Sequence, residues 1–295
     1  MNQIIDQRII NLYDRFTHGG ISRRDFLDRL AALTGSTAAA TALLPALTND
    51  YAQATIVAHD DPRLMSERVT YDSQAGKISG YLTRGKNKGK RPAVIAIHEN
   101  RGLNPHIMDV ARRLALEGFL VLAPDLLSVS GGTPPSEDAA REQHQKTDQK
   151  KMFTGAVAAI GFMKSHPEST GNVGAVGFCF GGGMVNRVAV ASPDLKAGVA
   201  YYGSQPAASD VPSIKAALVL HYAGLDERIN AGIAAYEAAL KENKKRYTIY
   251  MYPNVNHAFN NDIAGPRYDK AAADLAWSRT IALFKQELGT PPKAS

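Results

Sequence analysis

Seven short apolar runs place the strongest limit on how this chain can fold. Each is five to seven residues long and rich in Val, Ile, Leu, Ala or Tyr, which is typical of strands buried in a sheet. Helical patterns lie between several of them, at 108–118, 137–164 (in two pieces), 182–190 and 233–243, and a long terminal helix is predicted at 270–288. Because strands that alternate with helices need parallel crossovers, the sequence predicts an α/β fold: a doubly wound, mostly parallel sheet flanked by helices. The predicted strands are 78–83, 93–98, 119–123, 173–178, 198–202, 217–222 and 246–252.

Composition excludes several other classes of protein. The 295 residues are 44% hydrophobic and 21% charged, as in an ordinary globular chain, and one Cys excludes a disulfide scaffold or a multi-Cys metal centre. There is no uninterrupted run of about 18 apolar residues, which excludes a polytopic membrane protein. The net charge of +6 is modest and no Lys/Arg tract carries interleaved aromatics, so nucleic acid is not an expected partner.

The first 54 residues carry the pattern of an export signal. Ser22-Arg23-Arg24-Asp25-Phe26-Leu27 is a twin-arginine pattern, a weakly hydrophobic stretch follows over 30–47, and Ala52-Gln53-Ala54 is a small-residue cleavage site. This order predicts recognition by the twin-arginine export machinery, cleavage after Ala54 and a periplasmic location. Residues 55–295 then form the functional domain. The alternatives are an uncleaved membrane anchor and a helix-rich extension that stays attached, with Ile4, Ile5, Ile9, Leu12 and Phe16 on one face.

Cys179 is the candidate nucleophile. It lies in Gly177-Phe178-Cys179-Phe180-Gly181-Gly182, between a predicted strand and a predicted helix, which is the thiol version of the G-x-S-x-G elbow. The turn is tight, so its flanking residues must lack bulk, and Gly177 and Gly181 meet that need. The start of the following helix would lower the thiol pKa from its usual value of about 8.5. The alternative is a small buried hydrophobe among glycines that allow close packing.

Asp226 and His257 complete a predicted triad. They follow the predicted strands 217–222 and 246–252, and the order nucleophile, acid, histidine is the one that the elbow requires. His257 is the predicted general base, and Asp226 would accept a hydrogen bond from its other ring nitrogen. The backbone amides of Phe180 and Asn100 are the predicted oxyanion hole. Taken singly, His257 could be an ordinary loop histidine and Asp226 a capping residue, but their order and positions favour catalysis.

These residues resemble those of the dienelactone hydrolase (carboxymethylenebutenolidase) family, within the α/β-hydrolase superfold, over roughly 69–288. The resemblance implies eight mostly parallel strands, no cofactor and a Cys-His-Asp triad. It also implies a fourth catalytic residue, because the family has a glutamate that helps to deprotonate the thiol and matches Glu99. The motifs that carry the likeness are 98–104 (HENRGLN), 123–125 (APD), 177–182 (GFCFGG), 201–203 (YYG), 224–226 (GLD) and 257–259 (HAF).

Two departures from the family pattern argue against dienelactone itself as the substrate. The family holds the carboxylate of dienelactone with two arginines, and one of these positions, four residues after the histidine, is Asn261 here. The region of the other, 126–132, contains no Arg. Arg101, Tyr202 and Asn261 are the candidate substrate contacts that remain. Arg101 and Arg267 could bind an anion instead, but a solvated surface role is the favoured interpretation of each.

The sequence therefore predicts a cysteine-dependent hydrolase that cleaves a carboxylic ester or enol lactone through a thioester acyl-enzyme. Because a thiolate leaves more readily than an ordinary alkoxide, aryl esters and enol lactones should be favoured over alkyl esters. The alternatives are a non-catalytic α/β-hydrolase scaffold and a redox-sensing thiol protein, which the intact triad and the lack of a second Cys disfavour. The eight His show no H-E-x-x-H or comparable spacing, so no metal site is expected.

Overall fold

The computed structural model describes residues 5–49 and 55–292, and its centre is an eight-stranded sheet. The strand order is β1-β2-β4-β3-β5-β6-β7-β8. β2 pairs antiparallel with β1 and β4, and every other neighbouring pair is parallel. The predicted mostly parallel sheet is confirmed. The strands are β1 (Leu64–Ser73), β2 (Gly76–Gly85), β3 (Arg91–Ile97), β4 (Leu120–Pro124), β5 (Ser169–Phe178), β6 (Leu195–Tyr201), β7 (Ala217–Ala223) and β8 (Tyr247–Tyr252).

Helices cover both faces of the sheet, and the side chains of each strand alternate between the two resulting cores. In β3, Val94 and Ala96 pack in one core while Ile95 and Ile97 pack in the other. The first core includes α4 and α10, and the second includes α6, α7 and α9. The helix bounds are α4 (Pro105–Leu116), α5 (Glu137–Lys146), α6 (Gln149–Ser165), α7 (Phe180–Ala191), α8 (Glu227–Asn230), α9 (Ile233–Glu242) and α10 (Lys270–Leu288).

Two local features differ from the sequence prediction. β1 was not predicted because it is an edge strand with mostly exposed side chains, so it has no apolar run; only Leu64 and Tyr71 are buried. The loop after β4 lies outside the helical ranges predicted from the sequence but contains a 3₁₀ helix, Leu126–Ser130, which Asp125 caps by accepting the amide of Leu127. Two further 3₁₀ helices span Ala208–Ser213 and Gly265–Arg267.

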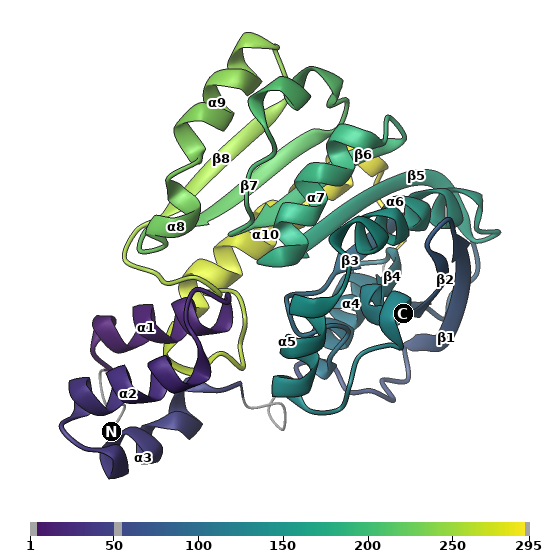
Figure 1. Cartoon of the computed structure of the whole chain (residues 1–295). Coiled ribbons are helices and arrows are strands. Elements are labelled where there is room, and N and C mark those ends of the chain that lie inside the picture. Colours follow the sequence, from purple (N-terminus) through teal and green to yellow (C-terminus); the bar gives the residue numbers. More distant parts are fainter. Residues whose placement is uncertain (1–4, 50–54, 293–295) are drawn as a thin grey trace.

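Three helices form an N-terminal unit, here defined as residues 5–49. They are α1 (Gln7–Thr17), α2 (Arg23–Thr34) and α3 (Thr37–Leu47), and Figure 1 shows them in purple at the lower left of the molecule. They share a small apolar core that includes Phe16, Phe26 and Leu30. This arrangement matches the alternative of a helix-rich extension. Export and cleavage remain predictions, and Ala52–Ala54 lies outside the described residues.

Among the described residues, no single helix has both the length and the apolar character to cross a bilayer. Taken together, α2 and α3 meet those two criteria, but they are bent by 110° relative to one another.

Candidate active site

The elbow after β5 holds Cys179 in a strained backbone conformation. Its φ of 55° and ψ of −115° lie where few residues other than glycine are found. Its amide donates to the Tyr201 carbonyl (3.0 Å), and its carbonyl accepts from the Gly183 amide (3.1 Å). A Cβ on Gly177 would overlap the carbonyl of Gly181, and a Cβ on Gly181 would overlap that of Ile97. The need for small flanking residues is therefore real, and the thiol is held at the start of α7.

Asp226 and His257 form the predicted acid–histidine pair. Nδ1 of His257 lies 2.5 Å from Oδ2 of Asp226, while Oδ1 of Asp226 accepts the amide of Ile229 as the cap of α8 (3.2 Å). Burial would raise the pKa of Asp226, but the charge of His257 lowers it. Burial would lower the pKa of His257, but the charges of Asp226 and Cys179 raise it well above its usual value. Nε2 of His257 has no hydrogen-bond partner among the described residues.

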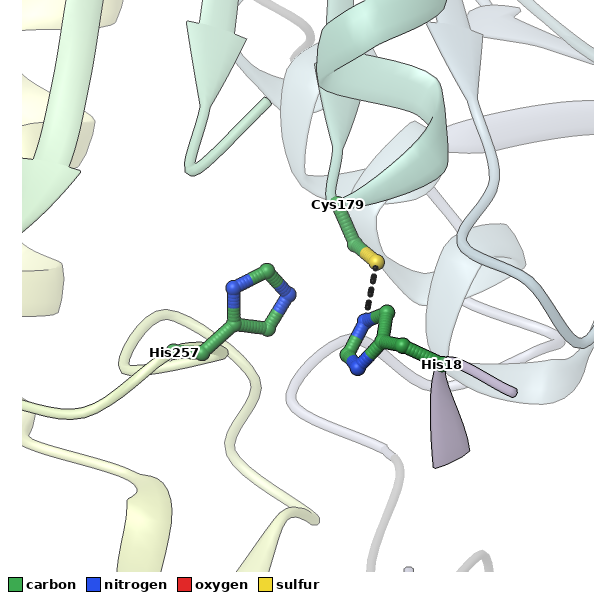
Figure 2. A group of neighbouring side chains, drawn as sticks. All are labelled: His18, Cys179 and His257. Atoms are coloured by element: carbon green, nitrogen blue, oxygen red, sulfur yellow. Dashed lines mark hydrogen bonds between the residues drawn. The ribbon is translucent and has the colours of Figure 1, made fainter. Parts of the chain in front are cut away.

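A second histidine, His18 of the N-terminal unit, makes the hydrogen bond to the thiol. Its Nε2 lies 3.1 Å from Sγ of Cys179, and its Nδ1 lies 2.8 Å from the Asp14 carbonyl oxygen and 3.2 Å from the Asp14 carboxylate. The rings of His18 and His257 are 4.7 Å apart at 81°. Figure 2 shows the sulfur between α7 and the two imidazoles, which come from opposite ends of the chain.

These two imidazoles decide the ionisation of the thiol. Burial would raise the pKa of Cys179, but the charges of His18 and His257 outweigh it and lower the pKa to about 6. Burial would lower the pKa of His18, but the Cys179 thiolate and the Asp14 carboxylate raise it to about 9. At neutral pH the thiol is therefore mostly a thiolate beside a protonated imidazole.

Glu99 and Asn261 are paired with one another. Glu99 is buried in the loop after β3, and Nδ2 of Asn261 donates to its Oε2 (2.8 Å). Both line a space of about 10 Å³ beside Cys179, close to the size of one water. Asn261 therefore orients the Glu99 carboxylate. It was predicted as a substrate contact, but it does not line the main cavity.

Asn100 and Arg101 are also engaged. The Asn100 side chain donates to the Thr17 carbonyl (2.8 Å) and accepts from Arg101 (3.0 Å). Arg101 is buried and ion-paired with Glu137 of α5, so it is not the solvated cation considered from the sequence. It lines the small space and not the main cavity.

The main cavity at Cys179 has a volume of about 290 Å³, near the lower end of the range for ligand sites. The predicted residues Asn100, Phe180, Tyr202 and His257 line it. The Tyr202 ring lies 4.8 Å from the His257 ring, and its buried hydroxyl has no partner among the described residues. Eight further residues that were not predicted from the sequence also line the cavity, among them His18, His144, Ser204 and Arg228.

The same cluster is the candidate metal site. His18, Cys179 and His257 offer ligand atoms within 4.8 Å of one another, and each imidazole is backed by an aspartate, as zinc-bound histidines often are. Zinc radii place an N and an S ligand about 3.6 Å apart. The observed Sγ–Nε2 distance of 3.1 Å is that of a hydrogen bond, so the side chains would have to spread apart to admit zinc. No metal site was expected because the histidines lack a metal-binding spacing in the sequence. Spacing along the sequence does not show that His18 lies next to Cys179 in the folded chain.

His18 and Asp14 were missed because residues 1–54 were set aside as a signal. The sequence did contain a signal that this segment folds against the rest of the chain. Ile9, Leu12 and Phe16 form one face of an amphipathic helix, and such an apolar face is normally buried against another part of a protein. His18 and Gly19 end that helix, which places a polar side chain where the helix meets the rest of the chain.

Comparisons with known proteins divide the chain into the same two parts. The model of the dienelactone hydrolase family matches residues 78–288, and a second model, described as YqhI-like, matches residues 2–35. A protein of Saccharolobus solfataricus named "Putative carboxymethylenebutenolidase" is 31% identical, covering 75% of this chain and 99% of its own length. The solved structure of a dienelactone hydrolase-like promiscuous phosphotriesterase, P91, from metagenomic libraries has a TM-score of 0.69. It is 26% identical and covers 77% of this chain and 100% of its own.

Almost the whole length of both relatives thus lies within the matched part of this chain, whereas about a quarter of this chain lies outside it. The first family model begins after the N-terminal unit ends.

Proposed function

This chain belongs to the dienelactone hydrolase family, and from that membership we propose that it is a cysteine-dependent hydrolase of a small carboxylic ester or lactone. The observation that carries the proposal is the position of Cys179. Its sulfur is held at a strained elbow, beside two imidazoles, at the wall of a cavity of about 290 Å³. A buried structural cysteine would need neither the strain nor the paired histidines.

The proposed reaction has two halves. In the first, the Cys179 thiolate attacks the carbonyl carbon, the C–S bond forms, and the carbonyl electron pair moves to oxygen, near the amides of Phe180 and Asn100. The C–O bond then breaks, and the leaving oxygen departs with the proton of the His257 imidazolium, which leaves His257 neutral. In the second, His257 accepts a proton from water as that water attacks the thioester. The C–S bond breaks, and a carboxylic acid and the thiolate are released.

The cavity argues for a substrate other than dienelactone. Arg228, the one arginine that lines it among the described residues, is already paired with Asp14 (3.6 Å), and the family's arginine position is taken by Asn261, which donates to Glu99. A small acyl group with a stabilised leaving group, such as an aryl ester or an enol lactone, fits both the cavity and the thiolate chemistry. p-Nitrophenyl acetate should turn over and ethyl acetate should barely react; equal rates would contradict this choice of substrate.

The test uses the full chain with p-nitrophenyl acetate. Cys179→Ala and His257→Asn should each lower kcat/KM by at least about a thousandfold, while His59→Asn, an exposed histidine outside the site, should leave it unchanged. Since Cys179 is the sole cysteine, intact mass after a brief reaction should show one acetyl group, absent in Cys179→Ala. Turnover that survives Cys179→Ala would refute the proposal.

Export is a separate proposal and rests on the sequence alone. We propose that the Arg23-Arg24 pair directs the folded chain to the twin-arginine machinery and the periplasm. Both arginines are exposed in the first turn of α2, although Arg23 is ion-paired with Asp138. Fractionation should find the chain in the periplasm and find an Arg23→Lys, Arg24→Lys variant in the cytoplasm. Identical distributions would refute it.

A further inference from the structure

The Cys179 sulfur is hydrogen-bonded to a histidine that does not belong to the predicted triad. Sγ of Cys179 is bonded to Nε2 of His18, whereas Nε2 of His257 has no hydrogen-bond partner among the described residues. The two rings face the sulfur from different directions (Figure 2). A triad of Cys179, His257 and Asp226 therefore leaves the strongest contact of the nucleophile unexplained.

His18 is prepared for proton transfer in the same way as His257. Its Nδ1 lies 2.8 Å from the carbonyl oxygen of Asp14, which can only accept, so Nδ1 carries the hydrogen. Its Nε2 is then free to take the thiol proton and, once protonated, to donate to the thiolate. The Asp14 carboxylate, 3.2 Å from Nδ1, stabilises the charged ring as Asp226 does for His257.

We propose that His18 and Asp14 form a second histidine–aspartate dyad that activates Cys179, so that the N-terminal unit is part of the active site and is retained in the working enzyme. The inference deepens the proposed function and rests on it for the role of the thiol. His18 accepts the proton of the Cys179 thiol, leaving a thiolate and an imidazolium. His257, whose Nε2 is open to the cavity, then serves the water of the second half-reaction.

Three contacts with the catalytic domain hold the unit in place. Arg228 of α8 is paired with Asp14 (3.6 Å), and Arg267 donates to Asn49 at the end of the unit (3.1 Å). The guanidinium of Arg141 in α5 lies 4.3 Å from the centre of the Phe16 ring. The unit is thus joined to three separate parts of the catalytic domain, and a removable leader has no need of such contacts.

The unit also touches the predicted oxyanion loop. The carbonyl of Thr17, the residue before His18, accepts from the side chain of Asn100 (2.8 Å). One turn of chain at the end of α1 therefore contacts both the nucleophile and the loop whose amide would hold the oxyanion.

The comparisons with relatives explain why membership of the dienelactone hydrolase family does not predict this dyad. The dienelactone hydrolase model begins at residue 78, and the S. solfataricus and P91 proteins are covered almost completely without needing the remaining quarter of this chain. His18 falls instead within residues 2–35, which a different family model matches. The second dyad is an addition to the family's site, supplied by a separate sequence module.

Other titratable groups also face the thiol, and the test must separate them. His257 comes from the loop after β8, Glu99 from the loop after β3, Tyr202 from the end of β6, and His144 from α5. Burial and His98 lower the pKa of His144 to about 3, so it is neutral, and burial with Glu99 raises the pKa of Tyr202, which is neutral too. His18 and His257 are the groups that favour the thiolate.

The experiment is the pH profile of iodoacetamide alkylation, followed by intact mass on full-length chains. The parent should show a midpoint near pH 6. His18→Asn should raise it by one unit or more, which lowers the thiolate fraction at pH 6 about fivefold. The midpoint is the readout because a thiolate of higher pKa is also more nucleophilic, which partly masks a change in rate. Asp14→Asn should shift it in the same direction by less.

The controls are His59→Asn and Asp28→Asn, which change the same residue types at exposed positions and should keep the parent midpoint. Ester turnover should fall at least tenfold in His18→Asn. An unchanged midpoint in a folded His18→Asn, or cellular enzyme whose intact mass begins at residue 55, would overturn the inference. If no aryl ester is hydrolysed by any form but the midpoint still moves, the proposed function fails and the dyad stands.

Discussion

The packing of the elbow can be tested with a single methyl group. Gly182 lies in the first turn of α7, and a Cβ there would sit 2.5 Å from the Tyr201 carbonyl oxygen and 3.0 Å from the Gly203 Cα. Both are backbone atoms that no rotamer change can move. Restoring a normal contact requires a displacement of roughly 0.5–0.9 Å. Such overpacking typically costs about 1–3 kcal/mol.

The same displacement should disturb catalysis, because the Tyr201 carbonyl also accepts the amide of Cys179 (3.0 Å). Errors of about 1 Å in a reacting group can cost about a hundredfold in rate. We therefore expect Gly182→Ala to lower the free energy of unfolding by about 1–3 kcal/mol and kcat/KM by about ten- to a hundredfold. Urea unfolding and p-nitrophenyl acetate hydrolysis below the unfolding transition measure the two effects separately.

Gly161→Ala is the matched control. Gly161 is exposed in α6, and no atom in the described part of the chain lies within 4 Å of the Cβ that would be added. Without a clash, the exchange should stabilise the helix by about 0.5–1 kcal/mol and leave turnover unchanged. A Gly182→Ala chain as stable and active as the parent would refute the packing described for the elbow. Lost stability with full turnover would refute the link from Tyr201 to Cys179.

Three further outcomes are expected. Dialysis against EDTA should leave ester hydrolysis unchanged, whereas added Zn²⁺ should inhibit it by bridging the thiolate and both imidazoles; equal inhibition of parent and His18→Asn would count against that cluster. Asn261→Leu removes the hydrogen bond to the buried Glu99 carboxylate and should cost about 1–3 kcal/mol in urea unfolding, so unchanged stability would show the bond to be unimportant. Burial lowers the pKa of His221 to about 3, so below pH 6.5 the unfolded chain binds a proton at this group that the folded chain does not. The free energy of unfolding should therefore fall by about 1.4 kcal/mol for each pH unit of acidification because of this group. His221→Gln should reduce the slope of stability against pH, and an identical slope would contradict the assignment.

The central sheet could be predicted because its strands are buried on both faces. Residues 93–97 of β3 and 217–220 of β7 are continuous apolar runs, and every residue of the two strands is buried, so their sequences clearly indicate strands. β1 has no such run, since it lies at the sheet edge with most side chains in water. The elbow was predictable for a related reason. Backbone atoms pack so closely against Gly177 and Gly181 that only glycine fits at these positions, and the glycines are visible in the sequence.

The site was only partly predictable, because sequence order does not report what folds over it. Cys179, Asp226 and His257 follow strands that end at one edge of the sheet, and parallel topology brings them together. Nothing comparable ties α1 to that edge. Its position depends on contacts such as Arg228 with Asp14, which only the folded chain reveals.

The proposed activation of Cys179 by His18 has a consequence for the time at which the thiol becomes reactive during synthesis. The two residues are 161 positions apart, so a ribosome adding about 5–20 residues per second makes the cysteine roughly 8–30 s after the histidine. His257 and the loops that seat α1 are made later still. A nascent chain or truncated fragment would therefore carry an ordinary, mostly protonated cysteine. Reactivity toward electrophiles would be confined to chains whose two ends have met.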